Sequence, residues 1–218
     1  KLYYIDVIKA HELKNADLTL VYHEHEVSKS HYYVTFETEK DGRINELCIN
    51  PLTGGVKKNY INVMVARTSF LLNLIQDAIQ RGYTSFGRDI LVPGVKNMRL
   101  YGYKLEGYYA NIDSLEAYFN ANLDLLKKDV RQEIFGDRDV YTKVNDSAPA
   151  KFTDNAVVKN SLISDGCLIE GTVENCILFR GVKIGKGAVV KNCILMTDNY
   201  VGHDCNLAYV VCDKNTII

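Results

Sequence analysis

Histidine and acidic residues gather in one short segment in the first third of the chain. His23, Glu24 and His25 are consecutive, and His31 lies nearby. Residues two apart on a strand share a face, so His23 and His25 could bind a metal ion together. No further ligand is evident and the neighbouring residues are polar. We therefore expect a solvated, charged loop here.

Two further side chains could do chemistry. His203 follows a glycine and could act as the general base of an acyltransferase, since histidine serves that role most often. A lone histidine beside a corner glycine is weak support for catalysis, and the alternative is a corner residue without a reaction. Asp89 follows Phe86, Gly87 and Arg88. Its carboxylate could hold a sugar hydroxyl, or it could close a turn or cap a helix.

Aromatic residues are dominated by tyrosine, with 15 tyrosines and no tryptophan. Tyr101, Tyr103, Tyr108 and Tyr109 are predicted on two adjacent strands. They could stack on a sugar, or they could be half-buried strand aromatics, and the residues leave both interpretations open. The chain contains neither a GxxxxGK[ST] nor a GxGxxG loop, so it shows no triphosphate site.

Composition excludes several classes of protein. The 218 residues carry 26 basic and 27 acidic side chains, a balance that gives no field for nucleic acid or an anionic membrane. No apolar run reaches the roughly 18 residues of a membrane span. The spacing of the six cysteines fits neither a CxxC pair nor a zinc cluster. We interpret them as reduced thiols packed as small apolar residues, which favours the cytoplasm. A start at Lys1 and an end in mid-pattern at Ile218 suggest a fragment.

The elements before the charged stretch alternate between helical and strand patterns. We predict an α/β domain over residues 1–135, then a linker over 136–155. Asp41-Gly42 predicts a type I′ turn between two strands. The expected helices cover residues 6–14, a segment capped by Thr68 or Ser69 and ended by Gly82, and a segment that starts at Asp113-Ser114. The expected strands cover residues 18–22, 31–36, 44–49, 60–66, 98–103 and 107–112.

Residues 156–218 contain an internal repeat. Lys159-Asn160-Ser161-Leu162 is echoed by Glu174-Asn175-Cys176-Ile177 and by Lys191-Asn192-Cys193-Ile194, with a degenerate copy near Tyr209. Small and aliphatic residues recur every six positions inside each unit. This pattern predicts a left-handed parallel β-helix with aliphatic residues inside and glycine or asparagine at its corners. Cys176 and Cys193 should stack as buried structural thiols.

Longer runs of residues carry a further signal. They are TSFGRDILVP at 84–93, NIDSLEAYFNANLDLL at 111–126, YTKVNDSAPAKF at 141–152, and the tail 160–196. Each resembles bacterial glucose-1-phosphate adenylyltransferase (ADP-glucose pyrophosphorylase). The resemblance implies the second half of a GT-A-like nucleotidyltransferase domain, followed by a left-handed β-helix. The family reaction joins ATP and glucose 1-phosphate with the help of Mg²⁺. No cofactor is expected in this segment.

The departures from the family pattern lie at its functional positions. Counting back from His11, Tyr3 stands where active members have a metal-binding Asp. Ile49-Asn50-Pro51 replaces a Glu-Lys-Pro whose Lys grips the sugar phosphate. Tyr109-Ala110-Asn111 replaces a Trp-Arg-Asp whose Asp binds Mg²⁺. The remaining pocket positions hold Tyr60 for a Ser, Asn62 for a Gly, and Ser85 for the Asp before Phe86.

These substitutions would remove the lysine that neutralises the sugar phosphate and the carboxylates that hold Mg²⁺, and phosphoryl transfer depends on both. One such contact supports about 3–4 kcal/mol of transition-state stabilisation, so losing several should suppress turnover by orders of magnitude. The resemblance thus narrows to the GlgD-type regulatory subunit. It implies a hetero-oligomer with the catalytic subunit or self-assembly, and a vestigial pocket open to a sugar phosphate or effector. The alternatives are an active sugar-phosphate nucleotidyltransferase, a hexapeptide acyltransferase, or an oligomerisation scaffold.

Overall fold

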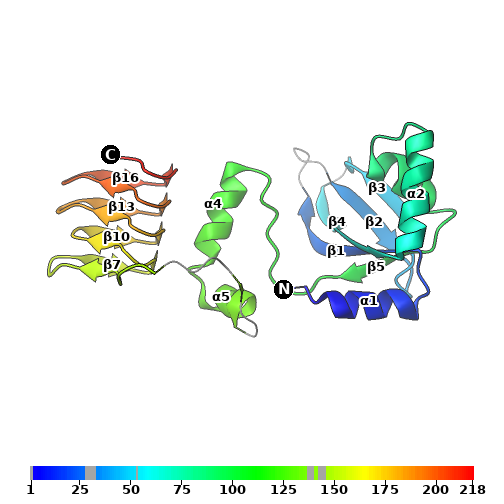
Figure 1. Ribbon diagram of the computed structural model, residues 1–218, viewed down its shortest axis with the longest axis horizontal. Coiled ribbons are helices and arrows are strands. Elements are labelled where there is room, and N and C mark those ends of the chain that lie inside the picture. Colours follow the sequence, from blue (N-terminus) through cyan, green and yellow to red (C-terminus); the bar gives the residue numbers. More distant parts are fainter. Residues whose placement is uncertain (1, 28–32, 53, 137–139, 142–145) are drawn as a thin grey trace. The chain divides into compact units, whose positions relative to one another are not determined.

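The computed structural model describes residues 2–27, 33–52, 54–136, 140–141 and 146–218. Contacts divide the chain into two compact units, Lys1–Tyr109 and Ala110–Ile218, here named the sheet unit and the β-helix unit (Figure 1). None of the described helices combines the length and the apolar composition needed to cross a bilayer.

The sheet unit is built on one mixed five-stranded sheet with the order β3-β2-β4-β1-β5. β1 runs parallel to β5, and the other neighbours are antiparallel. A parallel pair requires a crossover, and the helices of this unit supply it. The strands are β1 (Leu18–Val27), β2 (Val34–Thr38), β3 (Ile44–Ile49), β4 (Gly55–Ala66) and β5 (Leu100–Lys104).

Two apolar clusters cover the two faces of this sheet. On one face, Val7 of α1 (Tyr4–Leu13) packs with Val21 and Leu105. On the other face, Leu18, Phe36 and Leu100 pack with residues of α2 and η1. The helices on this second face are α2 (Thr68–Gln80), the π-helix η1 (Phe86–Leu91) and α3 (Val92–Gly94). Helices on both sides of a sheet confirm the predicted α/β class.

Two expectations about the strands are wrong. β1 continues through His23-Glu24-His25 to Val27, because these residues pair with Lys57, Lys58 and Asn59 of β4. Segment 107–112 is not a strand, so Tyr108 and Tyr109 lie outside the sheet. Cross-strand pairing with residues far away in the chain decides both outcomes, and local propensity does not contain that information.

Two expectations, one about a turn and one about the N-terminus of a helix, are also wrong. Gly42 has φ +90°, but Asp41 does not adopt positive φ, which a type I′ turn requires. Instead, the N–H of Gly42 donates to the carbonyl of Glu39 at 3.0 Å, as in a three-residue hairpin loop. Arg67 holds the N-cap position of α2 and makes no side-chain cap, so neither Thr68 nor Ser69 caps this helix.

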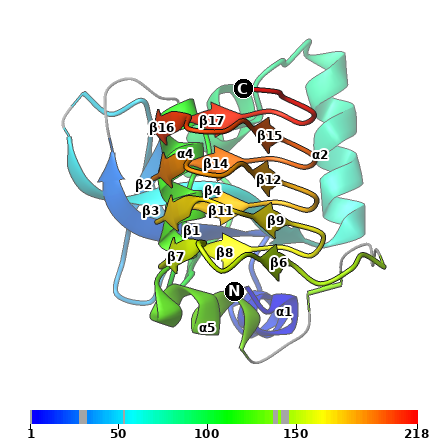
Figure 2. The same cartoon turned by 90° about the vertical axis from the view of Figure 1, so that its left-hand side faces the viewer.

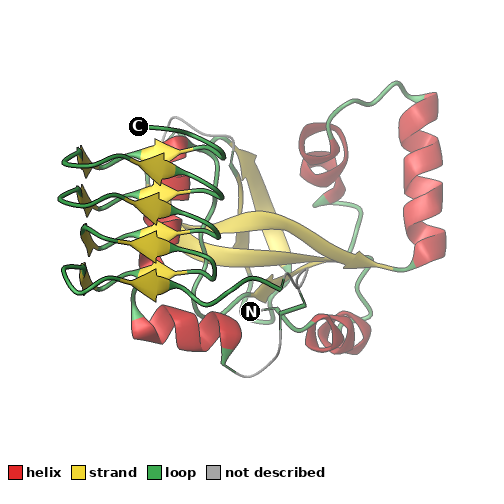
Figure 3. Ribbon diagram, turned by 60° about the vertical axis from the view of Figure 1, so that its left-hand side comes forward, coloured by secondary structure: helices red, strands yellow, loops and turns green. Residues whose placement is uncertain are grey.

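Four stacked coils of short parallel strands form most of the β-helix unit (Figure 2). The coils build three four-stranded sheets, and the stacking is visible from the side in Figure 3. One sheet contains β7 (Val157–Lys159), β10 (Thr172–Glu174), β13 (Val189–Lys191) and β16 (Asn206–Ala208). The second contains β8 (Leu162–Ile163), β11 (Ile177–Leu178), β14 (Ile194–Leu195) and β17 (Val211–Cys212). The third contains β6 (Lys151–Phe152), β9 (Leu168–Ile169), β12 (Lys183–Ile184) and β15 (Tyr200–Val201).

The corners of the coils need left-handed backbone, as predicted. Asn160, Asn175 and Asn192 occupy one corner with φ between +40° and +53°. Asparagine tolerates this region better than other non-glycine residues. Tyr209 takes the same corner in the last coil with φ +58°, which identifies it as the degenerate copy. Cys176 and Cys193 are buried and stacked, with the Cys193 N–H 3.4 Å from Cys176 Sγ.

Two helices precede the coils in the β-helix unit. The N-cap of α4 (Leu115–Asp124) is Ser114, whose hydroxyl accepts a hydrogen bond from the N–H of Ala117 at 3.0 Å, so the predicted start of this helix is confirmed. α5 (Lys128–Phe135) is a separate helix that follows α4. The Phe119 ring of α4 lies 6.4 Å from the ring of Tyr209.

Candidate functional site

The end of β3 carries Asn50, the position at which the resemblance implies a phosphate-binding lysine. Asn50 adopts φ +50° and is exposed. Its Oδ1 accepts a hydrogen bond from the Tyr33 N–H at 3.0 Å, and its own N–H donates to the Tyr33 carbonyl at 2.8 Å. The side chain therefore extends the β2–β3 pairing. It brings no positive charge to the strand end.

A bulge in β4 separates two of the predicted pocket residues. The register of β1 with β4 shifts between Leu20 and Tyr22, opposite the segment that contains Asn62. Asn62 is exposed and has φ +59°, the conformation that glycine adopts at no steric cost. The resemblance implies a glycine there, so the backbone geometry explains the substitution by asparagine. Tyr60 is buried, and burial raises the pKa of its phenol to about 12.

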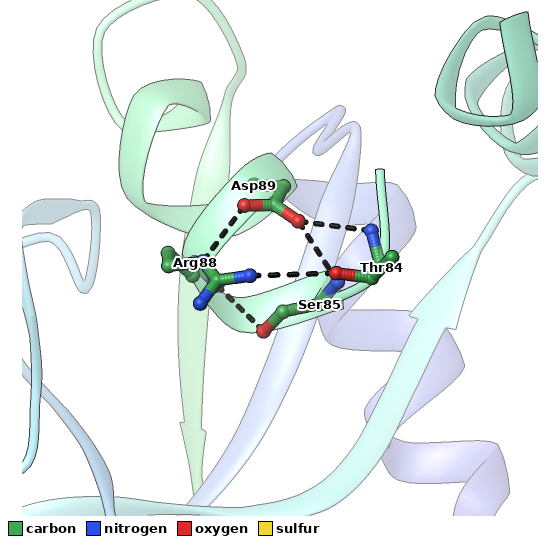
Figure 4. A network of polar contacts seen from close by, with 4 residues as sticks. All are labelled: Thr84, Ser85, Arg88 and Asp89. Atoms are coloured by element: carbon green, nitrogen blue, oxygen red, sulfur yellow. Dashed lines mark hydrogen bonds and ion pairs between the residues drawn. The ribbon is translucent and has the colours of Figure 1, made fainter. Parts of the chain in front are cut away.

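Asp89 closes the loop before η1 and is fully engaged there (Figure 4). Its Oδ2 accepts hydrogen bonds from the N–H groups of Thr84 and Ser85 at 3.0 and 2.9 Å, and its Oδ1 faces Arg88 Nε at 3.0 Å. The hydrogen bonds from Arg88 and from these two backbone groups lower the pKa of Asp89 to about 2. The turn interpretation of Asp89 therefore fits the geometry. Ser85 Oγ caps η1 by accepting the Arg88 N–H.

His23 and His25 lie in an aromatic cluster with Tyr109. The rings of His23 and Tyr109 stack at 4.8 Å, and His25 lies 5.4 Å from Tyr109. His23 Nε2 donates to the Gly107 carbonyl at 3.2 Å. The expected solvated loop is therefore wrong, because β1 holds both rings half-buried. His31 lies outside the described residues. No group of three or more His, Cys, Asp or Glu among the described residues could hold a metal ion.

The two positions that the resemblance assigns to metal binding offer poor ligands. Tyr3 is the N-cap of α1. Asn111 is exposed, and its Nδ2 donates to Asp113 Oδ2 at 2.7 Å. Magnesium prefers carboxylate oxygens and water. A phenol and a neutral amide carry no negative charge, so these two residues are weaker ligands for that ion than the carboxylates that the resemblance implies.

The predicted pocket residues of the sheet unit fall on both faces of its sheet. Ile49, Tyr60 and Phe86 belong to the core that also contains Leu100. Tyr109 belongs to the opposite core, beside Val21. The sheet therefore separates Tyr109 from the other three.

In the β-helix unit, His203 lines an open depression of about 540 Å³. The turn that leads from β9 to β10 contains only Glu170 and Gly171, whereas the next turn contains residues 185–188. Because the turn between β9 and β10 is the shorter of the two, the surface is recessed at this point. His203 Nδ1 accepts the Lys186 N–H at 3.0 Å, which places its proton on Nε2. The nitrogen left for chemistry is therefore a donor, which disfavours a role as a general base.

The sequence-based prediction did not single out a polar surface on the sheet. Residues that face the same side of β3, β2, β4 and β1 form two polar rows, which we name the polar face. The first row is Cys48, Thr35, Asn59 and His23, as the strand register shows. The second row is Glu46, Glu37, Lys57 and His25. The alternating polar residues of four segments were a usable signal, but the pairing of those segments was not predictable from local sequence.

Comparisons with known proteins agree with the resemblance. Residues 148–218 match the family model described as GlmU-like, C-terminal hexapeptide. Glycogen biosynthesis protein GlgD of Bacillus subtilis is 37% identical over 132 residues, which are 60% of this chain and 38% of that protein. Glucose-1-phosphate adenylyltransferase of Clostridium botulinum (strain Eklund 17B / Type B) is 31% identical over 201 residues, or 89% of this chain and 51% of that protein.

A third relative matches along nearly the entire chain. Glucose-1-phosphate adenylyltransferase of Fervidobacterium nodosum is 28% identical over 218 residues, which are 99% of this chain and 52% of that protein. The chain thus spans about half the length of these adenylyltransferases, and less of GlgD. Both units contribute to the match, and the hexapeptide repeat is found independently. The chain belongs to the glucose-1-phosphate adenylyltransferase family of glycogen-biosynthesis proteins, with GlgD among its relatives.

Proposed function

We propose that this chain is part of a regulatory, catalytically impaired subunit of glucose-1-phosphate adenylyltransferase in glycogen synthesis. The observation that carries the proposal is the geometry of Asn50. Its side chain is committed to the Tyr33 backbone, and it is uncharged at the position where the family grips the sugar phosphate. Phosphoryl transfer depends on cations placed around the phosphates, so this substitution removes a main source of rate.

Asn111 supports the same proposal from the β-helix unit. The family reaction uses Mg²⁺, and the corresponding family residue is a carboxylate. Here the amide of Asn111 donates to Asp113 instead. Losing a charged ligand weakens a site for a hard cation.

The β-helix gives the proposed subunit a means of assembly. Each coil stacks on its neighbours and buries a continuous apolar column, an architecture in which the sides and ends remain available for contacts. We infer association with a catalytic subunit of the same family or with a second copy, in which the subunit tunes the response to an effector. Six cysteines without a disulfide fit a reducing compartment such as the cytoplasm.

A gain-of-function experiment tests the proposal. Asn50→Lys and Asn111→Asp together, in the protein at its native length, should raise the formation of ADP-glucose from ATP, glucose 1-phosphate and Mg²⁺ by at least tenfold over the unmodified protein. A tenfold change corresponds to about 1.4 kcal/mol, well within the few kcal/mol of one electrostatic contact. Lysine at position 50 must adopt positive φ, so a modest loss of stability accompanies the gain.

Matched controls place the same residues elsewhere. Asn45→Lys lies on the same strand and Asn120→Asp lies on α4, both at exposed positions, and neither should change the rate. The unmodified protein should be silent alone and should change the rate or effector response of a catalytic subunit. Robust turnover by the unmodified protein alone would overturn the proposal and favour an active nucleotidyltransferase. Turnover with an acyl-CoA donor would favour the acyltransferase alternative.

A further inference from the structure

Helix α2 has apolar residues on two sides, although a surface helix normally has one apolar stripe that faces its own core. Phe70 and Leu74 face inward and pack against the buried core of the sheet. Leu72, Ile75 and Ile79 lie on the outer side and are 56%, 43% and 72% exposed. We name these three residues the outer stripe. A contiguous apolar surface of this kind marks an interaction site more often than isolated exposed residues do.

The spacing of the outer stripe is that of a helix–helix seam. Leu72, Ile75 and Ile79 are three and then four residues apart, the alternation found where two helices pair along their length. A partner helix can place its own apolar side chains between them. A small ligand needs a concave site that encloses it, and the outside of a helix is convex. The stripe therefore favours another helix as its partner.

The polar residues beside the outer stripe carry no charge. They are all exposed and comprise Thr68, Ser69, Asn73, Gln76 and Gln80. An apolar centre with a polar rim and few charges is the composition of protein–protein interfaces. α2 contains neither lysine nor arginine, which a helix lying on an anionic membrane carries on its polar face. The surroundings of the stripe thus indicate a protein partner and not a membrane.

The charge distribution on α2 suits contact with a second copy of the same helix. Asp77 is the single charged residue of α2, and it pairs with Arg81 at 2.9 Å. It follows Ile75 by two residues, about 200° around the helix, and so points away from the stripe. Two copies of the stripe can therefore meet without opposing like charges. We propose that α2 pairs with α2 of a second copy, outer stripe against outer stripe, in an isologous contact.

This inference rests on the proposed function, because self-association is one of the two forms of assembly proposed there. It adds the surface that makes the contact and places that surface on the sheet unit. α2 is only 13 residues long, so the contact is small. Interfaces at the low end of the size range are weak and transient, so the association should depend on concentration.

Analytical ultracentrifugation of the protein at its native length tests this proposal. The weight-average mass should rise with concentration. Ile75→Lys and Ile75→Glu each set like charges against each other across the pair, so each variant should need at least about a tenfold higher concentration to reach the same mass. An equimolar mixture of the two variants should recover the association, because opposite charges then face each other. Leu13→Lys and Leu13→Glu, at the 85% exposed last residue of α1, are the matched controls and should leave the mass unchanged.

Four outcomes would overturn the proposal. The first is a protein that stays monomeric at all concentrations. The second is an association that both Ile75 variants retain, which would assign it to another surface. The third is a lost association that the mixture does not recover, which would mean that the stripe contacts a different surface of the second copy. The fourth is a midpoint of thermal unfolding that falls further in the Ile75 variants than in the Leu13 variants under monomeric conditions, because the stripe would then be covered by its own chain. No substrate is present, so these results are independent of the adenylyltransferase test.

Discussion

The sheet unit buries more polar side chains than the β-helix unit. Of the buried polar residues, His11, Thr19, Thr35 and Asn59 lie in the sheet unit, and Asn199 lies in the β-helix unit. Asn199 is satisfied, because its Oδ1 accepts the Thr216 N–H at 2.7 Å. By contrast, acceptors of the sheet unit such as Asn59 Oδ1 lack a partner among the described residues.

This difference suggests that the β-helix unit contributes mainly stability, whereas the sheet unit has side chains available for binding. A repeat buries its backbone and side chains through the same contact in each coil, so little is left unpaired. The mixed sheet has register shifts between Leu20 and Tyr22 and between Glu37 and Thr38. Such irregularities concentrate at functional sites, because they direct side chains away from regular pairing. The sheet unit is therefore the part of the chain to search for ligands.

The largest effect we expect in this comparison comes from the β-helix core. Leu195 of β14 is fully buried and points into the coil. Leu195→Ala should lower the free energy of unfolding by about 2–5 kcal/mol, the cost of a cavity in a core. Hydrogen exchange should show lost protection in β11, β14 and β17, with β1–β5 unchanged. Leu168→Ala, at a less buried position facing outward, is the control. Loss of protection in β1–β5 as well would show that the two units unfold together.

A smaller effect concerns the asparagine corner. Asn192 has φ +50°, and alanine adopts this conformation at a cost of about 1–2 kcal/mol. Asn192→Ala should therefore lower the free energy of unfolding by about that amount, whereas Asn192→Gly should be close to neutral. Asn206→Ala, in an exposed strand position, should change little. Equal losses for alanine and glycine would mean that side-chain hydrogen bonding, and not backbone strain, governs the corner.

The smallest effect concerns His11 and the pH. His11 Nδ1 contacts Thr19 Oγ1 at 2.9 Å, and burial, reinforced by Arg67, lowers the pKa of the imidazole. The unfolded chain then binds a proton near pH 6.5, before the folded chain does. Stability should thus be constant above about pH 6.5 and should decline as the pH falls below it. Chemical unfolding at about pH 7.5 and 5.5 measures the decline.

His11→Gln should reduce this pH dependence, while His203→Gln at an exposed position should keep it. A decline that is unchanged in His11→Gln would assign the pH response to other groups. The β-helix unit, which buries no histidine among its described residues, should show no corresponding loss of protection at the lower pH.

The repeat and the helices could be predicted because their signals are local. Each coil carries its own apolar positions and its own corner residue, so Asn175 and Asn192 identify their corners without knowledge of distant contacts. Ser114 and Gly82 mark helix boundaries for the same reason, through hydrogen bonds to groups a few residues away. The strand predicted over 107–112 does not form. A strand requires pairing with another strand, and the local sequence does not show whether a partner is present.

The sequence by itself determined the β-helix, the family and the presence of uncharged asparagine at positions 50 and 111, because these depend on residue identity and short spacing. Only the tertiary structure decided that His23 belongs to β1, that Asn59 faces it, and that Glu37 and Glu46 lie side by side. Strand register brings these residues together from separate segments. A shift of one residue would turn each side chain to the other face, so the polar face exists only once the sheet has formed.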